Sequence, residues 1–162
     1  MTASLEVVAR AVNGWRAEVS GPLVVGLCGA QGSGKSTLAG QLQARLEGEG
    51  VKVAVLSLDD LYLSRAARTE LAERVHPLWA TRGVPGTHDV ALGELVLDGL
   101  WRGERLALPR FDKGADNPAG PVAWPVVEGV DVVLFEGWCV GARPQDEAEL
   151  VTPVNGLERE RD

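Results

Sequence analysis

Residues 29–36 of this chain read Gly29-Ala30-Gln31-Gly32-Ser33-Gly34-Lys35-Ser36 and fit the phosphate-binding loop pattern G-x-x-x-x-G-K-[ST] at every position. The loop follows a short apolar run, residues 22–28, that is typical of a strand, and it precedes a helical pattern over residues 37–46. Glycines let backbone N–H groups wrap around phosphate oxygens, and the N-terminus of the next helix adds its positive dipole end. Strand, glycine loop and helix together predict a binding site for a nucleoside triphosphate.

The nucleotide-binding residues expected from this motif are Gly29, Ala30, Gln31, Gly32, Ser33, Gly34, Lys35, Ser36 and Thr37. Lys35 is expected to reach the β- and γ-phosphates, and the Ser36 hydroxyl is expected to ligate Mg²⁺. The alternative interpretation is a glycine turn without a ligand, which the complete motif and its two flanks disfavour. The loop does not by itself decide between a kinase, a GTPase and an ATPase.

The composition predicts one domain, residues 1–162, with a formal net charge of −7. Because no run of Lys or Arg occurs, nucleic acid is not an expected partner. No apolar run approaches the roughly 20 residues that span a bilayer, and the N-terminus lacks the basic region and apolar block of a signal peptide. We therefore expect a cytoplasmic location and no membrane partner. Cys28 and Cys139 have no metal or redox spacing, and each is expected to be a buried or half-buried thiol.

The hydrophobic pattern alternates helices with strands along the chain. Helices are expected over residues 3–19, 37–46, 64–75 and 89–101, and strands over residues 22–28, 51–58 and 129–135. Residues 103–128 contain several prolines and are expected to hold only short strands. This alternation predicts an α/β layer fold with a mostly parallel sheet. Ligands of such folds lie outside the carboxyl ends of the strands, where this chain has the phosphate loop and several carboxylates.

Carboxylates occur where the second and third expected strands end. Glu136 follows four apolar residues, where phosphate-loop proteins hold Mg²⁺ directly or through water; the alternative is a carboxylate that only ends a strand or caps a helix. Asp59 and Asp60 end the second strand, and a kinase acting on an alcohol needs a carboxylate to orient the hydroxyl and accept its proton. We assign that role to Asp59, with Asp60 sharing the substrate site. The alternative role for this pair is to cap the next segment.

Two polar loops offer further candidates. Arg82 could bind an acidic substrate with two parallel hydrogen bonds, and His88 could hydrogen-bond a hydroxyl. Asp89, which follows, fits a substrate role and a helix N-cap equally well. A second loop brings together Arg110, Asp112 and Lys113. The alternative interpretation of that loop is a solvated cluster of charges.

The order of these motifs resembles a known family. The motifs are GAQGSGKST over residues 29–37, SLDDLYLS over 57–64, RGVPGTHD over 82–89, LPRFDKGAD over 108–116 and VVLFEGWCVG over 132–141. In this order they are similar to those of the P-loop D-glycerate 3-kinases and their bacterial kinase homologues. That family belongs to the wider superfamily of uridine kinase, pantothenate kinase and phosphoribulokinase. The resemblance covers roughly residues 20–158.

The resemblance implies an ATP- and Mg²⁺-dependent kinase that phosphorylates a small anionic hydroxy acid, D-glycerate, to 3-phosphoglycerate. It implies that Asp59 is the base and that Glu136 is the acidic Mg²⁺ residue. The acceptor pocket would be lined by Arg82, His88, Arg110, Asp112 and Lys113. Two alternatives remain open: a kinase for another small alcohol of the nucleoside or pantothenate type, or an inactive nucleotide-binding remnant.

Family members of this kind continue beyond the point that corresponds to Asp162. Their continuation carries a basic lid over the phosphates and a further parallel strand. We therefore expect residues 1–162 to form the N-terminal portion of a P-loop kinase domain of the three-layer type, with the sheet incomplete on its C-terminal side. The strand before the phosphate loop, residues 23–27, is then expected to lie at an edge.

Overall fold

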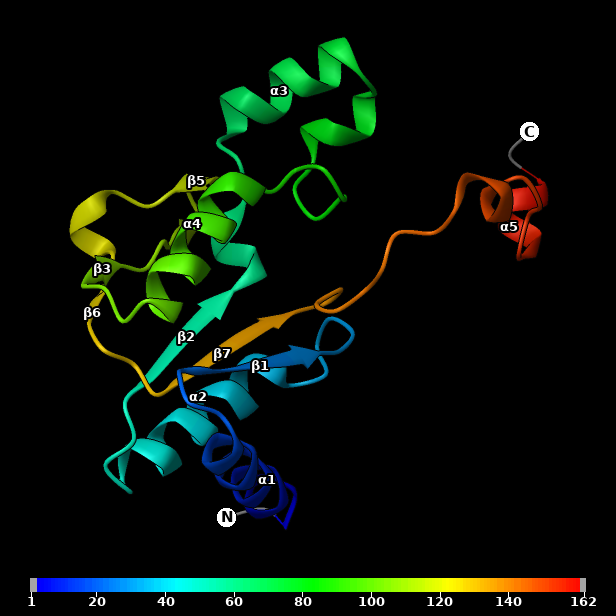
Figure 1. Cartoon of the computed structure of the whole chain (residues 1–162). Helices are drawn as coiled ribbons and strands as arrows, with labels where there is room; N and C mark the ends of the chain where they lie inside the picture. Colours follow the sequence, from blue (N-terminus) through cyan, green and yellow to red (C-terminus); the bar gives the residue numbers. More distant parts are fainter. Residues whose placement is uncertain (1–2, 161–162) are drawn as a thin grey trace.

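The centre of the fold is a three-stranded parallel sheet in the order β1-β7-β2. A computed structural model describes residues 3–160. The strands are β1 (Leu23–Cys28), β7 (Val132–Gly137) and β2 (Val53–Ser57). Val132 is opposite both Leu23 and Val53, so the three strands begin in register. Because all three strands run in the same direction, their carboxyl ends meet at one end of the sheet, as Figure 1 shows.

Helices cover both faces of this sheet. Helices α1 (Ala3–Glu18) and α2 (Lys35–Glu47) lie on one face, and α4 (Val90–Trp101) lies on the other (Figure 1). Alternate residues of β7 enter different cores: Val132 and Leu134 pack with α1 and α2, whereas Val133 packs with α4. This alternation is the period of a strand. The predicted α/β fold with three layers and a parallel sheet is confirmed.

Strand β1 lies at an edge of the sheet, as predicted. Within residues 3–160 its only strand neighbour is β7. Val25 is buried, but Val24 is 43% exposed and Cys28 is also exposed. The prediction that both cysteines are at least half-buried is therefore wrong for Cys28. The apolar sequence of β1 is typical of a strand inside a sheet that is covered on both faces. At the edge of the sheet, β1 has only one neighbouring strand and is less enclosed.

The remaining elements are short except for α3 (Arg65–Arg74). They are the 3₁₀ segments η1 (Leu58–Leu61), η2 (Pro77–Ala80), η3 (Pro121–Ala123) and η4 (Glu147–Leu150), the strands β3 (Leu106–Ala107), β4 (Phe111–Asp112), β5 (Asn117–Pro118) and β6 (Val126–Val127), and the helix α5 (Gly156–Arg159). The four short strands confirm the prediction for residues 103–128. In Figure 1 the chain after β7 leads away from the sheet to α5. No helix in the part of the chain that the structure describes is long and apolar enough to cross a membrane.

Strand β7 differs from the expected strand in its limits. Residues 129–131 precede it, and the strand continues through Glu136 to Gly137. Glu136 is part of the ladder, opposite Leu27 of β1 and Ser57 of β2. In the sequence, a charged residue after an apolar run indicates that the strand has ended. The backbone of Glu136 nevertheless pairs with both neighbouring strands. This register sets Glu136 beside the beginning of the phosphate loop.

Candidate active site

The phosphate loop connects β1 to α2, and its backbone explains its glycines. Gly32 and Gly34 have φ angles of 74° and 85°, in the left-handed region that glycine adopts without the penalty of a Cβ atom. A Cβ atom at Gly29 would lie 2.8 Å from Ser33 Oγ, so a larger residue would displace that side chain. The other predicted nucleotide contacts in this segment, Ala30, Gln31, Ser33 and Thr37, are exposed. The loop therefore presents an open surface that is shaped by its backbone.

Lys35 is the first residue of α2 and folds back over the loop. Its Nζ donates to the carbonyl oxygen of Ala30 at 3.3 Å. The ammonium group thus lies over the concave side of the loop, the position from which such a lysine contacts the phosphates of a nucleotide.

Glu136 lies beside Ser36 and is 5% exposed. Its Oε1 accepts hydrogen bonds from Ser36 Oγ at 2.8 Å and from Ser57 Oγ at 2.9 Å. The fold thus brings together the two residues predicted to hold Mg²⁺, although they are 100 positions apart. Hydroxyl and carboxylate oxygens are the hard donors that Mg²⁺ prefers, so these residues fit the ion. No cluster of three or more His, Cys, Asp or Glu able to hold a metal occurs within residues 3–160, so an ion here would also need nucleotide oxygens or water.

Asp59 is the second residue of η1 and lies two positions after Ser57, the last residue of β2. Its Oδ2 accepts a hydrogen bond from Lys113 Nζ at 2.6 Å, and its Oδ1 accepts one from Tyr62 Oη at 3.0 Å. Burial alone would raise the pKa of Asp59, but the bonds from Lys113 and Tyr62 outweigh burial and lower this pKa. The charge of Lys35 acts in the same direction, which puts the Asp59 carboxylate within electrostatic reach of the phosphate loop. Asp59 is therefore an ionised carboxylate beside that loop.

Asp60 has different surroundings from its neighbour. Its side chain is 18% exposed and accepts hydrogen bonds from the Phe111 amide at 3.0 Å and from Arg110 Nη1 at 3.3 Å. Burial raises the pKa of Asp60, in the opposite direction to the shift at Asp59. The two adjacent carboxylates thus divide into one that faces Lys113 and one that holds the segment carrying Arg110 and Phe111.

Asp112 and Lys113 lie in one turn but face different partners. Asp112 Oδ1 accepts hydrogen bonds from the amides of Gly114 and Ala115 at 2.8 and 3.0 Å. Asp112 therefore closes its own turn, whereas Lys113 reaches Asp59. Both side chains are exposed, so the predicted substrate contact of Asp112 stays a prediction.

Arg82 and His88 lie at the two ends of the other predicted loop. Arg82 Nη1 donates to Asp116 Oδ1 at 2.6 Å. The His88 ring stacks on Tyr62, with ring centres 4.5 Å apart. Burial lowers the pKa of His88, and its Nε2 is buried without a hydrogen-bond partner among the described residues. Asp89 is the N-cap of α4, where its Oδ1 accepts a hydrogen bond from the Leu92 amide at 2.9 Å. Of the two roles expected for Asp89, the structure thus shows the helix cap.

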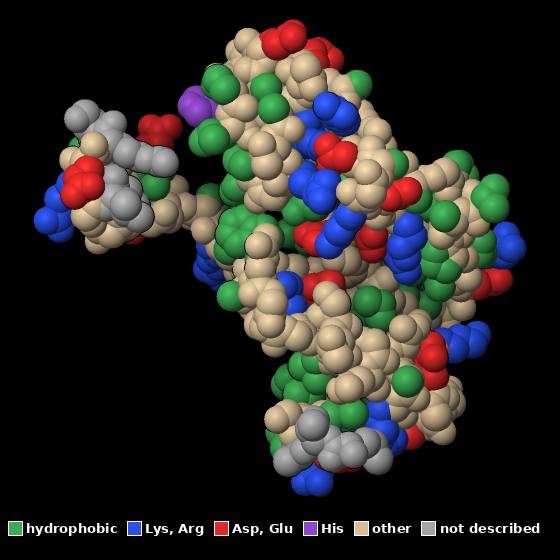
Figure 2. All heavy atoms as spheres, turned by 180° about the vertical axis from the view of Figure 1, so that it is seen from behind, with side chains coloured by type: hydrophobic (Ala, Val, Ile, Leu, Met, Phe, Trp, Pro, Cys, Tyr) green, Lys and Arg blue, Asp and Glu red, His purple; other side chains and the backbone are tan. Residues whose placement is uncertain are grey.

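Four residues of this region were not predicted from the sequence: Ser57, Tyr62, Arg68 and Asp116. Ser57 and Tyr62 lie two and three positions from Asp59, so the short 3₁₀ turn after β2 was the available signal. Arg68 lies in a polar helix and Asp116 in a loop, and nothing in their sequence context connects them. Figure 2 shows that Lys and Arg side chains are intermixed with Asp and Glu over the middle of one face of the molecule.

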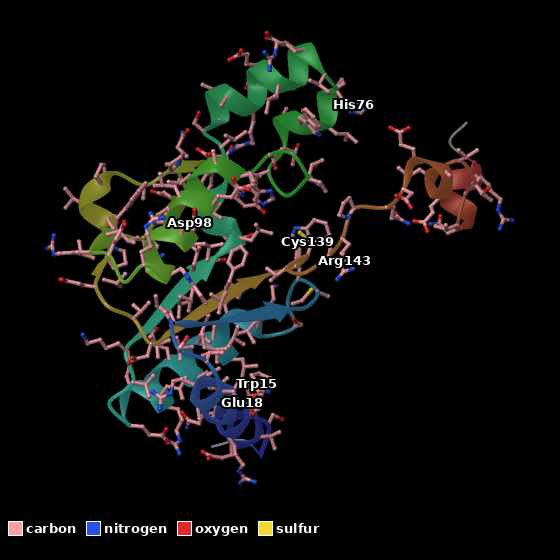
Figure 3. All side chains as sticks on the ribbon, in the orientation of Figure 1. Trp15, Glu18, His76, Asp98, Cys139 and Arg143 are labelled. Carbon is pink, nitrogen blue, oxygen red and sulfur yellow. The ribbon has the colours of Figure 1, made fainter. Side chains whose placement is uncertain are left out.

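The two thiols flank the same end of the sheet. Cys28 Sγ donates to the carbonyl oxygen of Trp138 at 3.2 Å. Cys139 follows β7 and lies near the phosphate loop in Figure 3. Both cysteines are free, and burial raises the pKa of the Cys139 thiol.

Comparison with known proteins agrees with this geometry. The profile of the methylmalonyl Co-A mutase-associated GTPase MeaB family matches residues 7–64, the segment that contains the phosphate loop. Over 139 residues the chain is 38% identical to the uncharacterized kinase mug58 of Schizosaccharomyces pombe, with 80% of this chain and 50% of that protein covered. Over 145 residues it is 37% identical to the chloroplastic D-glycerate 3-kinase of Arabidopsis thaliana, with 83% of this chain and 32% of that protein covered.

The solved structure of D-glycerate 3-kinase from Cryptococcus neoformans superposes with a TM-score of 0.82 at 34% identity. The match covers 93% of this chain and 57% of that structure. The chain thus spans half or less of the length of the two curated relatives named above. It is homologous to D-glycerate 3-kinase and shares the fold of P-loop kinases.

Proposed function

We propose that this chain forms the nucleotide and acceptor sites of a kinase that transfers the γ-phosphoryl group of ATP to D-glycerate, giving 3-phosphoglycerate. One observation carries this proposal: the phosphate loop, the Ser36–Glu136 pair and the ionised Asp59 lie at the same end of one parallel sheet. Homology to D-glycerate 3-kinase supports the choice of acceptor.

On the nucleotide side, the loop amides and Lys35 would bind the phosphates. Ser36 and Glu136 would hold Mg²⁺, which when bound neutralises charge on the β- and γ-phosphates. Ser57 would keep the Glu136 carboxylate oriented, because its hydroxyl donates to Oε1 at 2.9 Å. These groups act by positioning and by stabilising charge, which supply most of the catalysis in phosphoryl transfer.

On the acceptor side, Asp59 would orient the hydroxyl and accept its proton. The acceptor oxygen would bond to the γ-phosphorus as the bond to the bridging oxygen of ADP breaks. Lys113 lies 2.6 Å from Asp59, so a hydroxyl at Asp59 would have an ammonium beside it for the carboxylate of the acceptor. The His88 ring, which stacks on Tyr62, would form part of the wall of the pocket beside Asp59. Arg82, Arg110, Asp60 and Asp112 would complete the pocket.

An ADP-release assay tests the proposal. The 162-residue protein is incubated with Mg·ATP and, in separate reactions, with D-glycerate, L-lactate, uridine and pantothenate, with an acceptor-free reaction as control. We expect ADP release to depend on D-glycerate and to exceed that with the other acceptors. Release that is equal with and without every acceptor, in a protein that binds Mg·ATP, favours the inactive nucleotide-binding alternative. Preferential use of uridine or pantothenate favours a kinase for another alcohol.

A further inference from the structure

A buried arginine in α3 has no role in the site described so far. Arg68 is 0% exposed, and a fully buried guanidinium is costly unless its charge and its N–H groups are matched. Its Nη2 lies 2.6 Å from Asp116 Oδ2, and its Nη1 donates to the Leu63 carbonyl at 2.5 Å. Because Arg68 is fully enclosed, it contacts no ligand. Among the described residues, Asp116 is the carboxylate that pairs with this buried charge.

Asp116 joins this buried arginine to one that a ligand can reach. Its second oxygen, Oδ1, accepts a hydrogen bond from Arg82 Nη1 at 2.6 Å. The Arg82 side chain is 35% exposed and, with Arg65, Thr69 and Asp116, lines a surface hollow of about 550 Å³. Both guanidinium groups, of Arg68 and Arg82, lie 5.9 Å from the centre of the Phe111 ring. The hydrogen bond from Arg82 lowers the pKa of Asp116, so this carboxylate stays charged.

The backbone around Asp116 fixes the place of its carboxylate. Asp116 has a φ angle of 54°, the one non-glycine residue with positive φ among those described. Asp and Asn enter this region more readily than other side chains. The next residue, Asn117, accepts a hydrogen bond from the Arg65 amide at 3.0 Å and so ties the turn to the start of α3. The carboxylate is therefore held in place before any ligand arrives.

From this arrangement we infer that Asp116 is a positioning residue, which fixes the Arg82 guanidinium so that its remaining N–H groups meet the anionic group of the acceptor. Arg68 anchors Asp116 from the buried side. This inference rests on the proposed function, in which Arg82 binds an acceptor carboxylate. An arginine held in advance by a carboxylate loses less side-chain entropy when it binds an anion.

The test measures binding, so that it does not depend on turnover. Calorimetry gives the affinity for D-glycerate, with a non-hydrolysable ATP analogue and Mg²⁺ present, and separately the affinity for Mg·ATP. The variants are Asp116→Asn, which keeps the backbone preference and removes the charge, Arg82→Ala, and the double variant. Glu70→Gln is the matched control, because it makes the same chemical change on the exposed face of α3, where Glu70 lies 3.9 Å from Arg74.

We expect Asp116→Asn to weaken D-glycerate binding by about tenfold and to leave Mg·ATP binding within about twofold, with no change in Glu70→Gln. In the Arg82→Ala background, Asp116→Asn should add less than about twofold, because a residue that acts through Arg82 has nothing left to position. Unchanged D-glycerate affinity in Asp116→Asn, an equal loss of Mg·ATP affinity, or additive losses in the double variant would each overturn the inference.

Two further outcomes separate this inference from the proposed function. If the unmodified protein phosphorylates D-glycerate and Asp116→Asn binds it normally, only the positioning role is wrong. If the unmodified protein binds no anionic hydroxy acid, both are wrong. Should Asp116→Asn fail to fold, the pair Arg68→Met with Asp116→Asn removes the buried cation that lost its partner, and the same tenfold loss is expected there.

Discussion

The phosphate loop and the acceptor side of this site are built by different means. The loop is one continuous segment, residues 29–37, and its shape follows from glycine positions and backbone conformation. The acceptor side depends on ion pairs between distant segments. These pairs are Lys113–Asp59, Arg110–Asp60 and Arg82–Asp116, separated by 54, 50 and 34 positions. The difference implies that nucleotide binding and acceptor handling can be disrupted separately, and three changes test this.

The largest effect is expected from Asp59→Asn, which keeps the shape of the side chain and removes the proposed base. Turnover should fall by about 10²–10⁴-fold, while Mg·ATP affinity stays within a few-fold of normal. Steady-state ADP release with D-glycerate and calorimetry with ATP measure the two quantities. Activity that survives this change and is lost in Asp60→Asn would show that the roles of the two carboxylates are reversed.

A change in the phosphate loop should weaken nucleotide binding and have less effect on the acceptor. Lys35→Ala removes the ammonium that lies over the loop, and Mg·ATP affinity should fall by at least about tenfold, or about 1.4 kcal/mol. D-glycerate binding in the absence of nucleotide should change much less than Mg·ATP binding, because the hydrogen bond of Lys35 is made to Ala30, within the loop itself. Calorimetric titrations of the same preparation with each ligand check both statements. Equal ATP affinity in the variant and the unmodified protein would refute the nucleotide site.

The smallest effect concerns the titration of Asp59. Lys113→Met removes the strongest hydrogen bond that opposes burial, so the pKa of Asp59 should rise. In the unmodified protein the ionised Asp59 stabilises the fold above the unfolded-state pKa of about 3.9, and this contribution is lost as pH falls through the lower folded-state pKa. Carboxyl carbon NMR across pH 2–7 measures the shift, and Lys52→Met, a change at another exposed lysine, is the control. An Asp59 titration that is the same in Lys113→Met and in the unmodified protein would mean that the ion pair does not form in solution.

The expected elements agree with the structure where a single local pattern specifies them. Helices α1 and α4 follow from apolar periodicity, and Asp89 makes the N-cap of α4, which was one of its two possible roles. The limits of β7 and the exposure of Cys28 did not follow. Both depend on which strands lie alongside, since backbone pairing carries the ladder through Glu136 and an edge position exposes Cys28.

For the site, the sequence by itself determined the phosphate loop, because that motif is encoded in adjacent residues and in glycines that permit positive φ. It also placed Asp59 and Glu136 at the ends of strands, which the parallel sheet brings together. Only the tertiary structure decided the distant partners: Ser57 on Glu136, and Asp116 between two arginines. A hydrogen bond between side chains depends on distance in space, and separations of up to 79 positions leave no local pattern to read.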